Sequence, residues 1–174
     1  MQRQGPQGMP ISLQSMRLRR VAVMMCGTLM VACTGGSPPK PVKARITFVA
    51  QSDVNPDATG RASPVVVRVY QLQQDAKFAN ADFFALFDDE EKVLGPDLMA
   101  RDEVTLEPGE RKQVEFDVKG DAKFVGAIAA YRDIRNSHWR DLQPAPKKGL
   151  MNIVKKDGIQ VDVARAQVKV TVFD

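Results

Sequence analysis

The sequence predicts an all-β fold, a two-sheet antiparallel sandwich of about eight strands with a short helical insertion. Apolar and polar residues alternate along most of the chain after residue 43, as in strands that bury one face. Turn residues such as Pro108-Gly109 and Asp157-Gly158 separate these short segments. Two antiparallel sheets can bury the alternating residues of both inner faces against each other.

The strands are expected at residues 44–50, 64–72, 103–106, 112–118, 124–131, 150–155, 159–163 and 168–173. In the segment 112–118, Val114, Phe116 and Val118 fall on one side and are expected to face inward. The small residues of the segment 124–131 indicate a crowded central strand. Asp157-Gly158 lies between two alternating runs and predicts a hairpin.

An aromatic cluster interrupts this pattern between the second and third strands. Asn80 or Asp82 is expected to cap a short helix that presents Phe83, Leu86 and Phe87 on one face. Acidic residues are poorly placed at a helix C-terminus, so the helix should end near Asp88. The acidic run 88–91 lacks the spacing of a calcium-binding loop and is expected to form a solvated turn.

The N-terminal segment has the features of a secretion signal. Arg17, Arg19 and Arg20 precede an apolar stretch over residues 21–31, which is too short to span a bilayer. The tetrad Met30-Val31-Ala32-Cys33 resembles the lipobox of bacterial lipoproteins. The resemblance implies lipid attachment at Cys33, and several acyl chains would give stable membrane attachment. The alternative is an ordinary signal peptide followed by a free cysteine.

Three regions are therefore expected. Residues 1–32 form a leader and lipoprotein signal peptide that is removed. Residues 33–43 contain the lipidated cysteine and a tether rich in Pro and Gly, which should act as a semi-extended spacer. Residues 44–174 form the β-sandwich domain. Thr34, rather than Asp, follows Cys33 and by analogy with known sorting rules favours the outer membrane.

The charge of the mature chain argues against nucleic acid as a partner. The sequence has 25 basic and 21 acidic residues. Arg3, Arg17, Arg19 and Arg20 precede Cys33 and no acidic residue does, so the mature chain carries equal numbers of each. The basic footprint of a nucleic-acid-binding protein is therefore missing. Cys26 also lies in the signal, so no disulfide is expected within the domain.

No catalytic or metal-binding constellation is evident in the sequence. His138 is the only histidine, and no Gly-x-Ser-x-Gly motif is present. Clusters of His and Cys that could bind a metal are also missing. We therefore expect no enzyme activity, cofactor, metal or small-molecule substrate. His138 and Trp139 are expected to anchor a loop, with the Trp ring packed on the sandwich edge.

Several segments together resemble one known family. Asn55-Pro56-Asp57, Gly60-Arg61-Ala62-Ser63-Pro64 and the strand 65–72 are similar to the TssJ lipoproteins of type VI secretion systems. The segments 81–84, 106–110 and 125–132 and the pair Trp139-Arg140 agree in order, and the match runs from Cys33 to the C-terminus. The resemblance implies a transthyretin-like sandwich, lipid-anchored to the outer membrane and facing the periplasm. It also implies binding to the periplasmic C-terminal region of TssM, an IcmF-like inner-membrane protein.

The loop over residues 51–63 is the expected partner-binding site. It joins the first two strands, is polar and is longer than a tight hairpin requires. In the resembling family this loop contacts the inner-membrane partner. The candidate residues are Asp53, Asn55, Pro56, Asp57, Thr59 and Arg61. Asn55, Pro56 and Gly60 fit equally well a role in maintaining the turn of the loop itself, and residues 135–148 around Trp139 are the next candidate surface.

Two other classes of function compete with this prediction. A periplasmic carrier or carbohydrate-binding lipoprotein could use the same sandwich, but it would need exposed aromatic residues. The chain has only one Trp and two Tyr, and Tyr70 falls in a predicted core strand. An outer-membrane enzyme would have to rely on His138.

Overall fold

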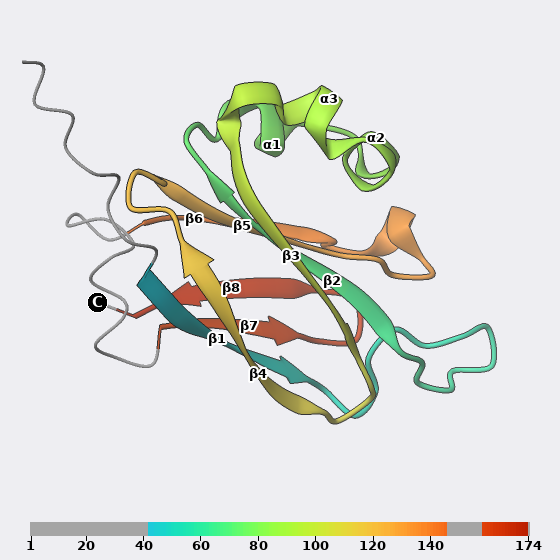
Figure 1. Ribbon diagram of the computed structural model, residues 1–174. Coiled ribbons are helices and arrows are strands. Elements are labelled where there is room, and N and C mark those ends of the chain that lie inside the picture. Colours follow the sequence, from blue (N-terminus) through green and yellow to red (C-terminus); the bar gives the residue numbers. More distant parts are fainter. Residues whose placement is uncertain (1–41, 146–157, 174) are drawn as a thin grey trace, which may run out of the picture. The chain divides into compact units, whose positions relative to one another are not determined.

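The computed structural model describes residues 42–145 and 158–173 and contains two four-stranded sheets (Figure 1). The first sheet has the strand order β4-β1-β7-β8 and the second the order β3-β2-β5-β6. The strands are β1 (Val42–Ala50), β2 (Val65–Leu72), β3 (Leu98–Leu106), β4 (Arg111–Val118), β5 (Phe124–Ala129), β6 (Arg140–Pro144), β7 (Ile159–Val163) and β8 (Val168–Val172). The predicted two-sheet sandwich is confirmed.

The pairing within the sheets is antiparallel except at one place. β1 runs parallel to β7, with Ile46 opposite Ile159 and Ala50 opposite Val163. The sequence pattern did not predict this pairing, because it joins segments far apart along the chain. β6 was also missed, whereas the expected strand over 150–155 and the turn residues 156 and 157 lie outside the described residues. β7 and β8 form the expected antiparallel pair.

The main core lies between the two sheets. β1, β4 and β7 contribute alternate residues from one side, among them Ile46, Phe116 and Val161, which are all buried. β2 contributes Val65, Val67 and Val69 from the other side, together with residues of β5. Phe116 is only 3% exposed, so the predicted orientation of its strand is confirmed.

A second core lies on the outer face of the β3-β2-β5-β6 sheet, beneath a helical insertion (Figure 1). The insertion contains α1 (Ala76–Asn80), α2 (Phe83–Asp88), α3 (Glu90–Leu94) and the 3-10 helix η1 (Gly95–Asp97). Its buried residues Phe78, Phe83, Leu86 and Leu94 pack on Tyr70, Leu72 and Ile128 of the sheet. β2 is therefore buried on both faces, which explains its nearly continuous apolar sequence.

Close approach of the insertion to the sheet depends on Gly126 in β5. A Cβ atom at this position would lie 2.7 Å from the ring of Phe78, which is closer than packed atoms allow. The missing side chain lets the Phe78 ring lie directly on the sheet, where it also contacts Tyr70 at a centroid distance of 5.4 Å.

The acidic run 88–91 differs from the predicted solvated turn. Asp82 caps α2, accepting a hydrogen bond from the Phe84 amide at 2.9 Å, and α2 ends at Asp88 as expected. Asp89 then caps a further helix, α3, and accepts from the Lys92 amide. The acidic residues thus stand at a helix N-terminus, where negative charge is favourable. The prediction of a turn was wrong because it took the run only as the end of the preceding helix.

Arg68 of β2 joins the insertion to the sheet. Its guanidinium lies 2.9 Å from Glu90 of α3 and 2.6 Å from Glu103 of β3. It also donates to the Phe87 carbonyl and lies 4.0 Å above the centroid of the Phe87 ring. Hydrogen bonds to charged groups are among the stronger interactions at a partly buried site, so this contact fixes the insertion in place.

Candidate functional site

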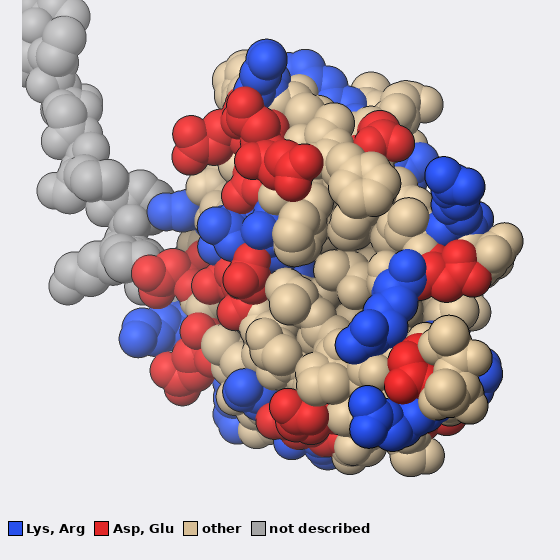
Figure 2. All heavy atoms as spheres, turned by 90° about the vertical axis from the view of Figure 1, so that its right-hand side faces the viewer, with Lys and Arg blue, Asp and Glu red and all other residues tan. Residues whose placement is uncertain are grey.

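Three connections meet at one end of the sandwich, on the right in Figure 1. They are the loop over residues 51–64 between β1 and β2, the β5–β6 connection, and the turn over residues 164–167 between β7 and β8. The β5–β6 connection includes the 3-10 helix η2 (Ile134–Asn136). We call this the loop end of the domain, and Figure 2 views the domain from that side.

The tip of the β1–β2 loop is organised around Asp57. Its Oδ1 accepts hydrogen bonds from the Thr59 amide at 2.9 Å, the Thr59 hydroxyl at 2.7 Å and the Arg61 amide at 3.0 Å. Gly60 provides the positive φ of 85° that the turn requires. The Thr59 hydroxyl, followed by the Arg61 amide, lowers the pKa of Asp57 to about 2, because both stabilise the carboxylate. The loop therefore has a fixed shape of its own.

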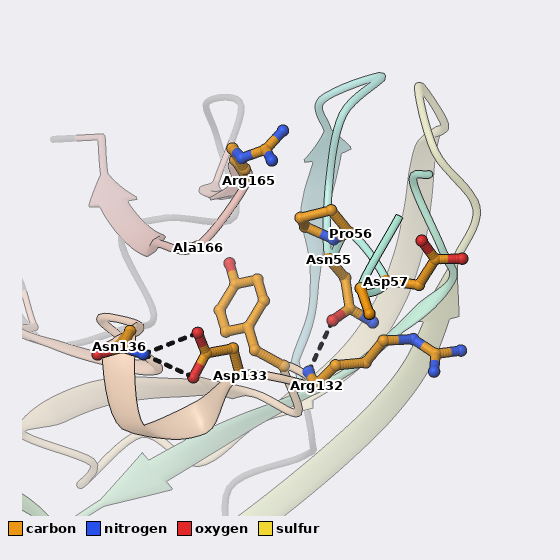
Figure 3. A pocket seen from close by; sticks show the side chains of 10 residues that line it. Asn55, Pro56, Asp57, Arg132, Asp133, Asn136, Arg165 and Ala166 are labelled. Atoms are coloured by element: carbon orange, nitrogen blue, oxygen red, sulfur yellow. Dashed lines mark hydrogen bonds between the residues drawn. The ribbon is translucent and has the colours of Figure 1, made fainter. Parts of the chain in front are cut away.

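Asn55 joins all three connections of the loop end. Its Nδ2 donates to the Pro64 carbonyl at 2.6 Å, and its Oδ1 accepts from the Arg132 amide at 2.7 Å (Figure 3). The backbone amide of Asn55 donates to the Arg165 carbonyl at 3.1 Å. Asn55 is 4% exposed and has a φ of 50°, a conformation that Asn tolerates better than most residues. The three connections are thereby held in one arrangement.

A hollow with a volume of about 640 Å³ lies between these connections. Tyr131 is 6% exposed, and its hydroxyl donates to the Ala164 carbonyl at 3.1 Å. Burial raises the pKa of this hydroxyl, so it stays protonated at neutral pH. Arg132 and Arg165 extend from opposite sides of the hollow (Figure 3). The lining residues are Asn55, Pro56, Asp57, Ala58, Tyr131, Arg132, Asp133, Asn136, Arg165 and Ala166.

The predicted partner-binding residues fall into two groups. Asp53, Thr59 and Arg61 are exposed, and Pro56 and Asp57 are partly buried on the lining of the hollow. Asn55, by contrast, is buried, and both polar atoms of its side chain are used within the domain. The predicted lipid attachment at Cys33 lies outside the described residues.

Sequence reasoning did not single out Arg132, Asp133 or Arg165. Arg132 and Asp133 follow β5, and Arg165 lies in the β7–β8 turn, so they are distant in sequence from the predicted loop. No local motif marks them as a group. Only the strand arrangement, in which β7 lies beside β1, brings Arg165 to the β1–β2 loop.

Trp139 anchors the second candidate surface as predicted. Its ring packs edge-on against Phe83 at a centroid distance of 5.2 Å and contacts both cores. The neighbouring Arg140 donates to the carbonyls of Phe78 and Ala81, which ties this strand to the helical insertion. His138 is exposed, and its amide donates to the Ala166 carbonyl at 2.9 Å.

The described residues give no indication of a metal centre. No group of three or more His, Cys, Asp or Glu side chains in residues 42–145 and 158–173 is placed to hold a metal ion. Among the helices described, none is long and apolar enough to cross a membrane. Tyr70 and Tyr131 are buried and Trp139 is partly buried, so these aromatic residues do not form an exposed platform for a sugar.

Comparison with known proteins agrees with the fold. The family T6SS-SciN, described as type VI secretion lipoprotein, VasD, EvfM, TssJ, matches residues 42–166, well over half of the chain. The chain is similar to the crystal structure of the type VI secretion lipoprotein TssJ1 from Pseudomonas aeruginosa. The identity is 31% and the TM-score 0.64, covering 77% of this chain and 98% of that one.

Other solved structures point the same way. Serratia marcescens Lip, described as a membrane-bound component of the type VI secretion system, has 27% identity and a TM-score of 0.66. That match covers 77% of this chain and 99% of Lip. A chain of the structure described as "T6SS protein TssM C-terminal domain (869-1107) from EAEC" has 25% identity and a TM-score of 0.57, over 75% of this chain and 98% of that chain. A comparison with curated protein sequences gave no match. The chain belongs to the TssJ family of type VI secretion lipoproteins.

Proposed function

We propose that this protein docks the periplasmic C-terminal region of the inner-membrane protein TssM through the loop end of the sandwich. A lipid on Cys33 would hold the domain at the outer membrane, facing the periplasm. Residues 33–43, the predicted tether, would connect Cys33 to the sandwich, with residues 42 and 43 already part of β1. Binding at both membranes would anchor the type VI secretion membrane complex. The leader over 1–32 would be removed.

The observation that carries this proposal is the fixed shape of the β1–β2 loop. Asp57 organises its tip, and Asn55 bonds it to both neighbouring connections. A loop that is ordered before binding loses little conformational entropy when a partner binds. Rigid sandwiches commonly present their recognition residues on such loops.

The likeness to a chain in the TssM structure supports the choice of partner. Three quarters of this 174-residue protein covers 98% of the aligned chain. The aligned chain is therefore much shorter than the TssM segment 869–1107, and we infer that it is a separate protein bound to that segment. We infer the same pairing for this protein.

Shortening the loop tests the docking surface. Replacement of residues 57–61 by a shorter link should abolish binding of the full-length lipoprotein, purified in detergent, to the periplasmic region of TssM. The melting temperature should stay within a few degrees, because the tip contributes no residue to either core. Binding is measured by biolayer interferometry and stability by differential scanning fluorimetry. Unimpaired binding by the folded variant would move the interface to residues 135–148 around Trp139.

Substitution of Cys33 tests the membrane anchor. A Cys33→Ser protein should take up no labelled palmitate and should no longer fractionate with the outer membrane, because it lacks the thiol that receives the lipid. The wild-type protein, expressed in the same cells, is the control. Continued labelling or outer-membrane fractionation of the Cys33→Ser protein would contradict lipid attachment at this residue.

A further inference from the structure

We infer that the hollow at the loop end accepts an acidic segment of the protein partner, whose carboxylates are bound by the guanidinium groups of Arg132 and Arg165. This inference rests on the proposed function, because the segment is expected to belong to the periplasmic region of TssM. It specifies the chemistry of the contact and adds two residues, outside the β1–β2 loop, that carry it.

The acidic groups lining the hollow already have partners within the domain. Asp57 Oδ1 accepts three hydrogen bonds from Thr59 and Arg61. Both carboxylate oxygens of Asp133 accept from Asn136 Nδ2, at 2.8 and 3.0 Å (Figure 3). Asp57 also pairs with Arg61 at 3.3 Å, so both carboxylates already have hydrogen-bond or ion-pair partners within the domain.

The two guanidinium groups at the hollow, by contrast, have few hydrogen-bond or ion-pair partners among the described residues. The Arg132 guanidinium makes no hydrogen bond or ion pair with the residues that the structure describes, although its backbone amide is fixed by Asn55. The Arg165 guanidinium makes one ion pair with the described residues, at 3.7 Å from the carboxylate of the exposed Asp53. The Arg165 carbonyl, in turn, accepts from the Asn55 amide. Asn55 thus fixes the backbone at both arginines while their charged ends extend outward.

Two guanidinium groups fixed at their backbones favour carboxylates as the ligand. Each guanidinium can donate two parallel hydrogen bonds to one carboxylate, a geometry that an ammonium group cannot match. An exposed ion pair such as Arg165 with Asp53 contributes little to stability, so a partner carboxylate can replace Asp53 at small cost.

The shape and surface of the hollow suit a segment of polypeptide. Its volume of about 640 Å³ falls within the range of pockets that hold drug-sized ligands, which are comparable in size to a few side chains. Pro56, Ala58 and Ala166 supply uncharged surface to the lining of the hollow. Figure 2 shows uncharged side chains across the middle of this end of the domain, with basic and acidic groups around them. Backbone and apolar side chains of the segment can lie on the uncharged surface while its acidic side chains reach the arginines.

Reversal of both charges tests the inference. We expect the full-length Arg132→Glu, Arg165→Glu double variant to bind the TssM periplasmic region at least about tenfold more weakly than the wild type. The fall in affinity with rising salt should also be shallower, because fewer opposite charges are paired. The matched control is Lys119→Glu with Lys123→Glu, which makes the same change in net charge at exposed residues of the β4–β5 turn, at the opposite end of the domain. The control should bind like the wild type.

Each result separates this inference from the proposed function. If the wild type binds and the Arg132, Arg165 variant binds within about twofold of it, the acidic-segment inference is overturned and the docking proposal stands. Weaker binding with an unchanged salt dependence also overturns the inference. A wild-type protein that fails to bind TssM overturns both. Melting temperatures of all variants confirm folding, and a Glu→Lys or Asp→Lys substitution in TssM that restores binding to the double variant would identify the segment.

Discussion

The β1–β2 loop and the helical insertion are both long connections between strands, yet they are held in place by different interactions. The insertion places Phe78, Leu86 and Leu94 at 0% exposure in a core of its own. The loop, apart from Val54, is held by hydrogen bonds centred on Asn55 and Asp57. The insertion therefore contributes to the free energy of unfolding of the domain. Residues at the tip of the loop, by contrast, can be substituted with little loss of stability.

The largest effect is expected in the insertion. Phe78→Ala should lower the free energy of unfolding by about 3–5 kcal/mol, because the ring is fully buried between α1 and the sheet. Chemical denaturation gives the change. The exposed Phe84 of α2, at 58% exposure, is the matched control, and Phe84→Ala should change stability by less than about 1 kcal/mol. Equal effects of the two substitutions would show that the insertion is not part of the core.

An intermediate effect is expected where the loop joins the domain. Asn55→Ala should cost about 1–3 kcal/mol, because the Pro64 carbonyl and the Arg132 amide lose their partner in a buried place. It should also weaken TssM binding, since three connections lose their common attachment. Asn55→Gly is the control that separates backbone strain from the lost hydrogen bonds, because glycine accepts the positive φ but has no side chain to supply those bonds. Wild-type stability of Asn55→Ala would contradict this role.

The smallest effect on stability is expected at the loop tip, and it depends on pH. The folded-state pKa of Asp57 is about 2, below the ordinary value of 3.8. The ionised Asp57 therefore contributes to the stability of the folded state above pH 3.8, and this contribution is lost as the pH falls toward 2. NMR should show the Thr59 and Arg61 amides shifting with a midpoint near pH 2 while the sheet amides stay unchanged. A midpoint near 3.8 would contradict the prediction, and Asp57→Asn should remove the transition.

The sequence pattern predicted strands with clear alternation or a continuous β-branched run. β4 was placed to within one residue because its inward residues alternate with exposed ones, and the run of valines placed β2 to within one residue although it is buried on both faces. β6 was missed because its first four side chains are all partly buried and show no alternation. It is held instead by contacts with the other sheet, including the Asp141 carboxylate, which accepts from the Val170 amide at 2.7 Å. Such contacts leave no periodic signal in a sequence.

The candidate site was likewise predicted only in part. Length, polarity and turn residues located the β1–β2 loop, since these features are local. The role of Asn55 depends on Arg132 and Arg165, which belong to other connections and approach only in the folded domain. The parallel pairing of β1 with β7 brings Arg165 there, and no local pattern predicts which strands will be neighbours in a sheet.

The pairing of β1 with β7 on one side and β4 on the other determines how the domain would respond to a pulling force. β1 lies between β4 and β7 and is hydrogen-bonded to both. A membrane anchor before β1 and a partner at the loop after it would pull along the axis of this strand. To slide lengthwise, β1 would have to break its bonds to both neighbours together, whereas an edge strand pulled in the same direction would break bonds to one neighbour only. A central first strand therefore gives the domain a direction of high mechanical resistance, aligned with the line between its two attachment points.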